Sequence, residues 1–405
     1  MHKIERLLHT LAPKGVGFRK LGEVINILKG KQLNKELLLD YGKYPVMNGG
    51  IYASGYWNEY NTDYPKIIIS QGGASAGYVN YMTSKFWAGA HCYAIELNSE
   101  KLNYKFLYYF LKNSQTILMK SQFGAGIPAL NKADIETLTI PIPPLEIQQE
   151  IVKILDAFTE LNAELNAELN ARKKQYKYYQ NMLLDFNDIN QSRKDAKEKL
   201  AQKPYPKRLK ALLHTLAPKG VEFRKLGEVC DFQKGKSITK KAVTFGKVPV
   251  ISGGRQPAYY HNEANRSGET IAISSSGVYA GYVSYWDIPV FLADSFSVSP
   301  KQKTLMPKYL FYYLTTQQDA IHATKSAGGI PHVYSKDLQN FLIPIPPLEI
   351  QQEIVKILDQ FSALTTDLQA GIPAEIKARK KQYEYYREKL LTFKPLTPNK
   401  EVKKA

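Results

Sequence analysis

The stretch IPIPPLEIQQEIVKILD occupies residues 140–156, and the same seventeen letters return at residues 343–359. The offset between the copies is 203 residues (343 − 140). This period far exceeds the ~20–50 residues of a solenoid repeat, so the chain contains a duplicated unit of domain plus helix. Two similar halves predict a target with two similar sites at a fixed separation. Three further segments are repeated: LLHTLAPKG (7–15 and 212–220), FRKLGEV (18–24 and 223–229), and ARKKQYKYY (171–179), which returns as ARKKQYEYY (378–386).

The 405-residue chain is strongly basic, with 55 Lys+Arg against 37 Asp+Glu and a formal net charge of +18. This charge favours a polyanionic partner, most simply nucleic acid. Its two cysteines, Cys92 and Cys230, lie at non-equivalent places in the two copies and predict neither a disulfide framework nor a zinc site. The sequence shows no signal peptide and no long apolar run, so we expect a cytoplasmic protein.

Each copy contains a β-rich globular region followed by a long helix, which predicts an α+β fold. Short strand-type runs are bracketed by glycine, and aromatic segments have helical spacing. For Tyr108 and Tyr109 we favour core packing over base stacking. The predicted strands are KIIIS (66–70), AGYVNYM (76–82), TIAIS (270–274) and AGYVSYW (280–286), and the predicted helices are 103–113 and 307–317.

The long helices begin after the proline pairs, because proline suits a helix entrance but breaks its interior. A helix over 145–186 would be about 60 Å long at 1.5 Å per residue. The second helix spans 348–393, and Gly371 and Pro373 should interrupt it. Apolar residues at spacings of 3 and 4 predict that the two helices pair as an antiparallel coiled coil. The candidate pairing residues are Ile151, Ile154, Phe158, Leu161, Leu165, Ile354, Ile357, Phe361 and Leu364.

The first long helix carries a second, smaller repeat. The unit ELNA occurs three times in succession, at 160–163, 164–167 and 168–171, and has no counterpart in the second helix. One unit is close to a helical turn and adds roughly 6 Å. Two interpretations are open: a duplication tolerated on an exposed helix, or a ruler whose length matters.

Motifs of known enzymes are missing. The segment GAGIPA (124–129) has the outline of a nucleotide-binding loop, but Pro128 and the partner segment AGGIPH (327–332) argue against it. We find no P-loop, no H-E-x-x-H, no G-x-S-x-G and no methyltransferase motif. The seven histidines do not cluster at metal-ligand spacings, so we expect no catalytic residues and no metal site.

Glycine-rich loops carry the candidate DNA contacts. KGK recurs at 29–31 and 234–236 and suits a phosphate clamp. Glycine allows close backbone approach, and serine, glutamine and asparagine can read base edges, although ordinary turn chemistry explains the same letters. The candidates are Lys29, Lys31, Asn48, Ser70, Gln71, Ser75, His91, Lys234, Lys236, Ser252, Arg255, Ser274, Ser275, Ser276 and Tyr279.

The two copies agree in their helices and differ in these loops. Gln71 corresponds to Ser275, and Ile51 corresponds to Arg255. Further differences are Gly72 with Ser276, Ser75 with Tyr279, and His91 with Ser295. A constant scaffold with variable loops is typical of two reading heads with different specificities.

The chain resembles the specificity (S) subunit of Type I restriction-modification systems over essentially its whole length. The resemblance is carried by GAGIPALNKADIETLTIPIPPLEIQQEIVKIL (124–155) and AGGIPHVYSKDLQNFLIPIPPLEIQQEIVKIL (327–358), and by ARKKQYKYYQNMLL (171–184) and ARKKQYEYYREKLL (378–391). The ELNA repeats resemble tetrapeptide repeats of this family's central helix, whose number sets the spacer length in the DNA site.

The resemblance implies a subunit without catalytic activity or a cofactor of its own. Each target-recognition domain would read one half of a bipartite, asymmetric DNA site. The helices would hold the domains apart and dock two adenine methyltransferase subunits, which bind S-adenosylmethionine and flip the target adenine. Restriction subunits with ATP- and Mg-dependent activity would join that core. The expected divisions are 1–142 (first recognition domain), 143–186 (first helix), 187–207 (linker), 208–345 (second recognition domain), 346–393 (second helix) and 394–405 (tail).

Two other functions remain open from the residues alone. A stand-alone bipartite DNA-binding protein would bind specifically without a partner. A nuclease or methyltransferase with a divergent site would be active as a single chain. Co-purification with an adenine methyltransferase would separate all three.

Overall fold

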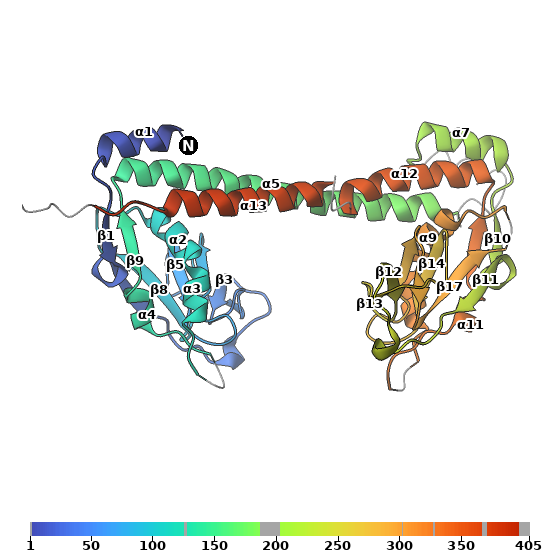
Figure 1. Ribbon diagram of the computed structural model, residues 1–405, viewed down its shortest axis with the longest axis horizontal. Helices are drawn as coiled ribbons and strands as arrows, with labels where there is room; N and C mark the ends of the chain where they lie inside the picture. Colours follow the sequence, from blue (N-terminus) through green and yellow to red (C-terminus); the bar gives the residue numbers. More distant parts are fainter. Residues whose placement is uncertain are drawn as a thin grey trace, which may run out of the picture. The chain divides into compact units, whose positions relative to one another are not determined.

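The computed structural model describes residues 2–124, 128–186, 203–301, 303–326, 329–366 and 371–396. The chain divides into two compact units, of which unit 1 comprises 1–166 and 376–405 and unit 2 comprises 167–375. These units cut across the sequence repeat. The 40-residue helix α5 (Leu145–Leu184) begins in unit 1 and ends in unit 2, while most of α13 (Ile372–Leu391) belongs to unit 1 (Figure 1).

Unit 1 contains a four-stranded antiparallel sheet, a smaller three-stranded sheet and a strand pair. The four-stranded order is β2 (Ile25–Lys29), β8 (Cys92–Leu97), β5 (Lys66–Ser70), β6 (Val79–Met82). The three-stranded order is β4 (Gly55–Trp57), β3 (Tyr44–Met47), β7 (Trp87–Ala88), with β3 and β7 parallel. The pair joins β1 (Gly17–Lys20) and β9 (Thr139–Ile142).

Unit 2 repeats this topology strand for strand. Its four-stranded order is β11 (Cys230–Lys234), β17 (Ser295–Pro300), β14 (Thr270–Ser274), β15 (Val283–Trp286). Its three-stranded order is β13 (Tyr259–His261), β12 (Val248–Ile251), β16 (Phe291–Leu292), again with one parallel pair. The strand pair is β10 (Glu222–Lys225) with β18 (Leu342–Ile345). The duplication predicted from the letters is therefore a duplication of fold.

The remaining α-helices divide between the units. In unit 1 they are α1 (His2–Leu11), α2 (Tyr104–Asn113), α3 (Gln115–Lys120) and α4 (Lys132–Glu136). In unit 2 they are α7 (Lys207–Leu216), α8 (Leu226–Val229), α9 (Pro307–Thr316), α10 (Gln318–Ala323), α11 (Ser335–Leu338) and α12 (Leu348–Thr366). Of these helices, α2 and α9 pack directly against the sheets. Most of the expected linker, 187–202, lies outside the described residues.

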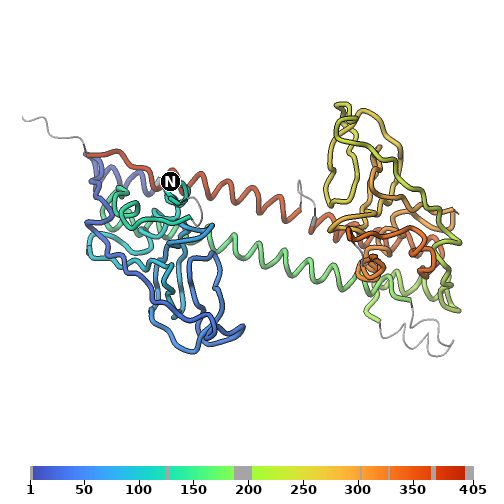
Figure 2. The backbone as a smooth tube through the Cα atoms, turned by 90° about the horizontal axis from the view of Figure 1, so that it is seen from below, coloured from blue at the N-terminus to red at the C-terminus, as the bar shows by residue number. Residues whose placement is uncertain are grey.

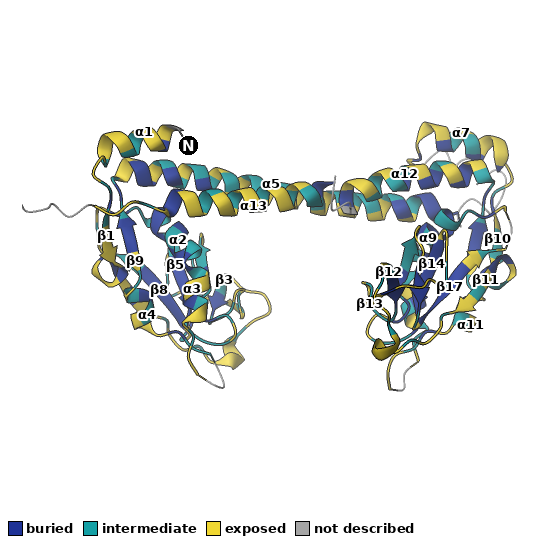
Figure 3. Ribbon diagram, viewed as in Figure 1, coloured by how far each residue is buried: buried dark blue, intermediate teal, exposed yellow. Residues whose placement is uncertain are grey.

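The middle of strand β5, residues 67–69, is continuously apolar because both faces of the strand are covered. Ile67 and Ile69 belong to the main core with α2, whereas Ile68 belongs to a second cluster beneath the three-stranded sheet, with Met47 and Phe86. Successive side chains of a strand point to opposite faces, so a strand buried on both sides shows no polar alternation. Figure 3 shows this buried centre within each unit.

The aromatic helices α2 and α9 lie where the spacing predicted them, and the preference for core packing is confirmed. Tyr109 is only 2% exposed, and Tyr108 is partly buried against the same core. Asn103 caps α2 by accepting hydrogen bonds from the backbone N–H groups of Lys105 and Phe106, at 2.9 and 3.0 Å.

A buried glutamine joins each long helix to its globular domain. Gln148 Oε1 accepts a hydrogen bond from Asn103 N at 2.7 Å, and its Nε2 donates to the carbonyls of Lys101 and Pro143 at 2.8 and 2.6 Å. Gln351 makes the same three contacts in unit 2, with Met306 N, Thr304 O and Pro346 O.

An aspartate about two turns further along each helix forms a second joint. Asp156 accepts from Tyr109 Oη at 2.5 Å and pairs with Lys105 Nζ at 2.7 Å. Asp359 repeats both contacts, with Tyr312 at 2.5 Å and Lys308 at 2.8 Å. Burial, together with the neighbouring carboxylate, raises the pKa of Tyr109, so its hydroxyl remains a donor. Each domain is thus attached to its helix by the same polar contacts.

The predicted pairing residues form one stripe on each long helix, within residues 151–165 and 354–364, and the members of each stripe have different partners. Ile151 and Ile354 are fully buried in the cores of their own units. The pairing contacts include aromatic ones: Phe158 stacks on Tyr386 with ring centroids 5.6 Å apart, and Phe361 stacks on Tyr179 at 5.2 Å. The two phenylalanines therefore meet the tyrosine-rich end of the opposite helix, while the isoleucines lie in cores to which leucines of that helix also contribute.

The other stripe residues are less enclosed. Ile154 and Ile357 pack at the edges of the two cores, Leu161 and Leu165 are half-buried, and Leu364 is 38% exposed. The described parts of the second helix are separate helices, α12 and α13, and Pro373 occupies the second position of α13.

The two ends of the described chain meet in unit 1. Val16 N donates to Lys394 O, and Leu396 N donates to Val16 O, both at 3.0 Å. Figure 2 shows the C-terminal segment alongside the N-terminal region. A Cβ on Gly15, whose φ is +105°, would lie 2.6 Å from the Pro395 carbonyl oxygen, so only glycine fits this crossing.

Candidate nucleic-acid interface

Three glycine-rich loops of unit 1 converge at one end of its four-stranded sheet. Asn48 Oδ1 accepts a hydrogen bond from His91 N at 3.0 Å, and Gln71 N donates to His91 O at 2.8 Å. Gly49 has a φ of +81°, and a Cβ there would lie 3.0 Å from Gly72 O. Loops distant in sequence thus form one surface, and their glycines allow the close packing.

The first KGK segment lies against the same loops. Gly30 N donates to Cys92 O at 2.9 Å and Lys31 N to Ala88 O at 2.8 Å. A Cβ on Gly30 would lie 2.1 Å from Gly89 O, so glycine is required and the flanking Lys29 and Lys31 are left exposed. A cavity of about 310 Å³ beside them also includes Asp63 and Glu96, so the charge there is mixed.

Unit 2 builds the same arrangement with a different anchor. Gly235 N donates to Ser295 O at 2.8 Å, which leaves Lys234 and Lys236 exposed. The guanidinium of Arg266 donates to Ser297 Oγ at 2.9 Å, to Asn265 O at 2.7 Å, and to the Gln233 and Lys234 carbonyls at 3.1 Å each. Arg266 is therefore committed to holding the lysine-bearing loop.

The serine-rich loops of unit 2 are joined to one another through hydroxyl groups. Ser274 Oγ donates to Ser252 O at 3.1 Å, and Ser275 N donates to Asp294 O at 3.1 Å. Ser276 Oγ is hydrogen-bonded to the Asp294 carboxylate. Asp294 did not emerge from the sequence reasoning, although it corresponds to Ala90 and so differs between the copies.

Burial divides the sequence candidates into groups. The hydroxyls of Ser70 and Ser274 are buried and bonded to backbone carbonyls, which is turn chemistry; Ser275 is also buried. Asn48, Gln71, Ser75, Ser252 and Ser276 are half-buried. The exposed candidates, which can meet a large ligand, are Lys29, Lys31, His91, Lys234, Lys236, Arg255 and Tyr279.

Further exposed lysines extend the basic surface of unit 2. Lys240, Lys241 and Lys247 follow the second KGK in the loop between β11 and β12. The stretch 234–247 contains no aspartate or glutamate, whereas the corresponding 29–43 contains Glu36 and Asp40. This charge pattern was visible in the sequence, and it makes the loop of unit 2 the more strongly basic.

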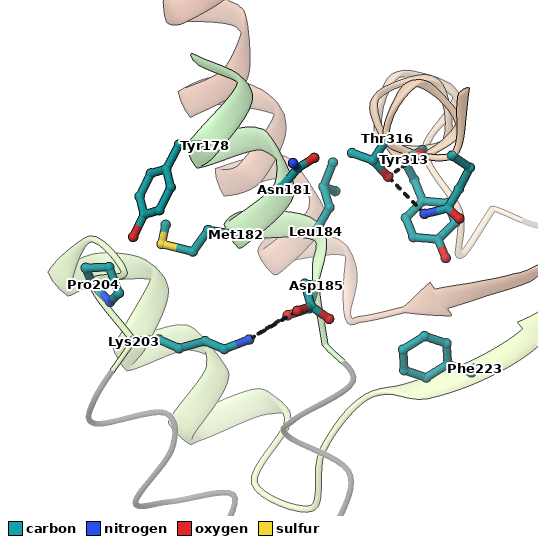
Figure 4. Close-up of a pocket in the computed structure, with 11 residues that line it drawn as sticks. Tyr178, Asn181, Met182, Leu184, Asp185, Lys203, Pro204, Phe223, Tyr313 and Thr316 are labelled. Carbon is teal, nitrogen blue, oxygen red and sulfur yellow. Dashed lines mark hydrogen bonds and ion pairs between the residues drawn. The ribbon is translucent and has the colours of Figure 1, made fainter. Parts of the chain in front are cut away.

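A separate cavity lies at the C-terminal end of α5 in unit 2. It has a volume of about 600 Å³, and its lining includes Tyr178, Met182 and Phe223 (Figure 4). Lys203 and Asp185 form an ion pair there at 3.9 Å. The cavity is lined by residues of α5 and its neighbours, and none of the candidate DNA-contact residues lines it.

Neither cysteine is an activated nucleophile. Burial raises the pKa of the Cys92 and Cys230 thiols to about 12, so both are protonated at neutral pH. Across the described ranges, no group of three His, Cys, Asp or Glu side chains could hold a metal ion. Among the helices that the structure describes, none is both long and apolar enough to cross a membrane.

The sequence matches the family of type I restriction modification DNA specificity domains twice, over 13–172 and 218–378. It is 33% identical over 397 residues to a Haemophilus influenzae protein assigned to the type I restriction enzyme specificity subunits, covering 93% of this chain and 96% of that protein. The EcoR124I/EcoR124II specificity subunit of Escherichia coli is 30% identical over 391 residues, covering 87% and 88%. The type I S subunit of M. genitalium has the same fold, with a TM-score of 0.65 at 24% identity and coverage of 93% and 96%.

Proposed function

The chain belongs to the type I restriction-modification DNA specificity subunits, and from this we propose that its exposed loop residues are the DNA contacts through which each unit reads half of a bipartite site. A specificity subunit is the non-catalytic recognition part of its complex and carries no cofactor of its own. The target-recognition domains would comprise 1–142 and 208–345.

The observation that carries this proposal is the pairing of one scaffold with two different sets of loops. The strands, the buried glutamine and the aspartate contacts repeat in both units. The loop ends of the sheets differ, with His91 in one unit and Arg255, Asp294 and Tyr279 in the other. Two half-sites of different sequence need this combination, because base contacts specify whereas the scaffold only positions.

Phosphate contacts would come from the exposed lysines. Lys29 and Lys31 in unit 1, and Lys234 and Lys236 in unit 2, flank glycines that hold each loop against the sheet end. Contacts of this type supply affinity without sequence preference and weaken as salt concentration rises. The loop of unit 2 (234–247) has five lysines and no acidic residue, whereas that of unit 1 (29–43) has four lysines and two acidic residues, so unit 2 would be the more salt-sensitive half.

The long helices would set the spacer and dock the partners. The partners would be two adenine methyltransferase subunits carrying S-adenosylmethionine, joined by restriction subunits that use ATP and Mg. Surface residues that are identical in both copies suit two equivalent docking sites. Tyr178 and Tyr385 occupy equivalent positions and are 57% and 59% exposed, and Lys153 and Lys356 are likewise identical and exposed.

Strand-resolved adenine methylation mapping tests the proposal. The chain would be expressed together with the methyltransferase of its own system in a host that lacks other adenine methylation. We expect one motif with two half-sites of different sequence, separated by unspecified bases. A perfect palindrome would contradict the proposal that the two units have different specificities. Methylation without a two-part motif would contradict the proposal that each unit reads one half-site.

A further inference from the structure

Arg255 presents a preorganised guanidinium in the loop that follows β12 of unit 2. Its Cζ lies 4.8 Å from the ring centroid of Tyr279 and 5.6 Å from that of Tyr282. Arginine stacks favourably on aromatic faces. Since Arg255 is exposed and Tyr279 is 40% exposed, this stacking holds the side chain in place at the surface instead of burying it.

The donors of this guanidinium remain available for a ligand. Within the part of the chain that the structure describes, no hydrogen bond or ion pair engages the Arg255 side chain. Arg266 of the same unit offers the contrast, because Nε and both terminal nitrogens donate to protein oxygens. A structural role therefore accounts for Arg266 and not for Arg255.

The position of Arg255 places it among the reading loops. Its loop is joined to the serine-rich loop by the hydrogen bond from Ser274 Oγ to Ser252 O. Tyr279 belongs to that second loop, so the arginine and the ring that holds it come from two loops bonded to each other. In unit 1 the equivalent positions hold Ile51 and Ser75, so this pair is specific to unit 2.

We propose that Arg255 is a specificity-determining residue that reads a guanine in the half-site bound by unit 2, with Tyr279 as its positioning residue. The inference rests on the proposed function of the loops. Two parallel N–H groups of an arginine match the O6 and N7 acceptors of guanine in the major groove. Lysine carries the same charge but is a point-like donor without this fork.

Selection from randomised duplex DNA tests the assignment. The full chain, in complex with its methyltransferase, binds the pool, and sequencing of the bound fraction gives the base preference at each position. Arg255→Lys should lower the preference for guanine at one position of one half-site by roughly 10- to 100-fold and leave the other positions unchanged. Tyr279→Phe should retain that preference, whereas Tyr279→Ala should reduce it.

The matched control is Lys240→Ala, which removes an exposed positive charge from the same unit. It should weaken binding to all sequences alike and leave every base preference unchanged. A wild-type motif that both Arg255→Lys and Arg255→Ala leave intact would overturn the assignment alone and make Arg255 a phosphate contact at most. A wild-type complex that selects no two-part motif would overturn the proposed function and this assignment with it.

Discussion

Deleting one ELNA unit, residues 164–167, should shorten the unspecified spacer of the DNA site by one to two base pairs. The unit lies within α5, which is helical without interruption from Leu145 to Leu184. Four residues at 1.5 Å each shorten the helix by about 6 Å and rotate it by about 40°. If the helix axis follows the DNA axis, 6 Å corresponds to about two steps of 3.4 Å.

The shortened helix should still fold, because the repeat keeps its pattern. Leu161, Leu165 and Leu169 are half-buried, while Glu160 and Glu164 are exposed. Removing one unit takes away one half-buried leucine and leaves the remaining leucines on nearly the same face. We expect the free energy of unfolding to fall by about 1–2 kcal/mol, less than for a fully buried leucine.

Methylation mapping measures the spacer directly in wild type and in the deletion variant. The matched control is Glu164→Ala, which changes the letters of the unit and keeps the helix length. We expect the control to retain the wild-type spacer and the deletion to shorten it with both half-sites unchanged. A deletion variant that methylates the wild-type motif with the wild-type spacer would refute the hypothesis that the number of ELNA units sets the spacer length.

Three further predictions concern stability, docking and pH. Gln148→Leu should lower the free energy of unfolding by about 2–4 kcal/mol in urea titrations, because buried backbone partners lose their hydrogen bonds. The control Gln149→Leu, at an exposed position, should change this free energy by no more than about 0.5 kcal/mol, and similar losses in both variants would contradict the buried joint. Tyr178→Ala should reduce the methyltransferase recovered by co-purification to about one subunit per chain, and the double variant Tyr178→Ala, Tyr385→Ala should recover no methyltransferase. Full recovery of the methyltransferase by the double variant would rule out these docking sites. Burial and a neighbouring arginine lower the pKa of Lys112 from 10.5 to about 8. The folded state therefore releases this proton at a lower pH than the unfolded chain does, and the free energy of unfolding should rise from pH 8 to 10.5. Lys112→Met should flatten that rise, and equal slopes of unfolding free energy against pH in wild type and variant would contradict the prediction.

Strands and helices with strong patterns could be located from the sequence. KIIIS is a strand at the predicted residues, and the first long helix ends two residues before the expected Phe186. The pairing partner of the stripes could not be located in this way. A period of 3 and 4 shows that one face of a helix is buried, but it does not say against what. Here Ile151 and Ile354 lie in the cores of the globular domains together with leucines of the opposite helix, and tyrosines near the end of that helix pack on Phe158 and Phe361.

The candidate site was predictable as a set of loops and less so as a set of side chains. Comparison of the two copies identified Arg255 and Tyr279 as differing residues, but not their stacking, which depends on how two loops approach. Ser70 and Ser274 could not be separated from Ser276 by letters alone, because each occurs in a glycine-rich turn. Burial separates them, and burial follows from the packing of the sheet end.

The identical joints of Gln148 and Gln351, and of Asp156 and Asp359, have an evolutionary consequence. Genetic recombination within the repeated seventeen-residue stretch would exchange one domain for another while the glutamine and aspartate contacts to the helix were retained. The encoded chain would keep its folded joint and acquire a different half-site in a single step. A bacterium could thereby change the self-marking of its whole genome without altering its methyltransferase.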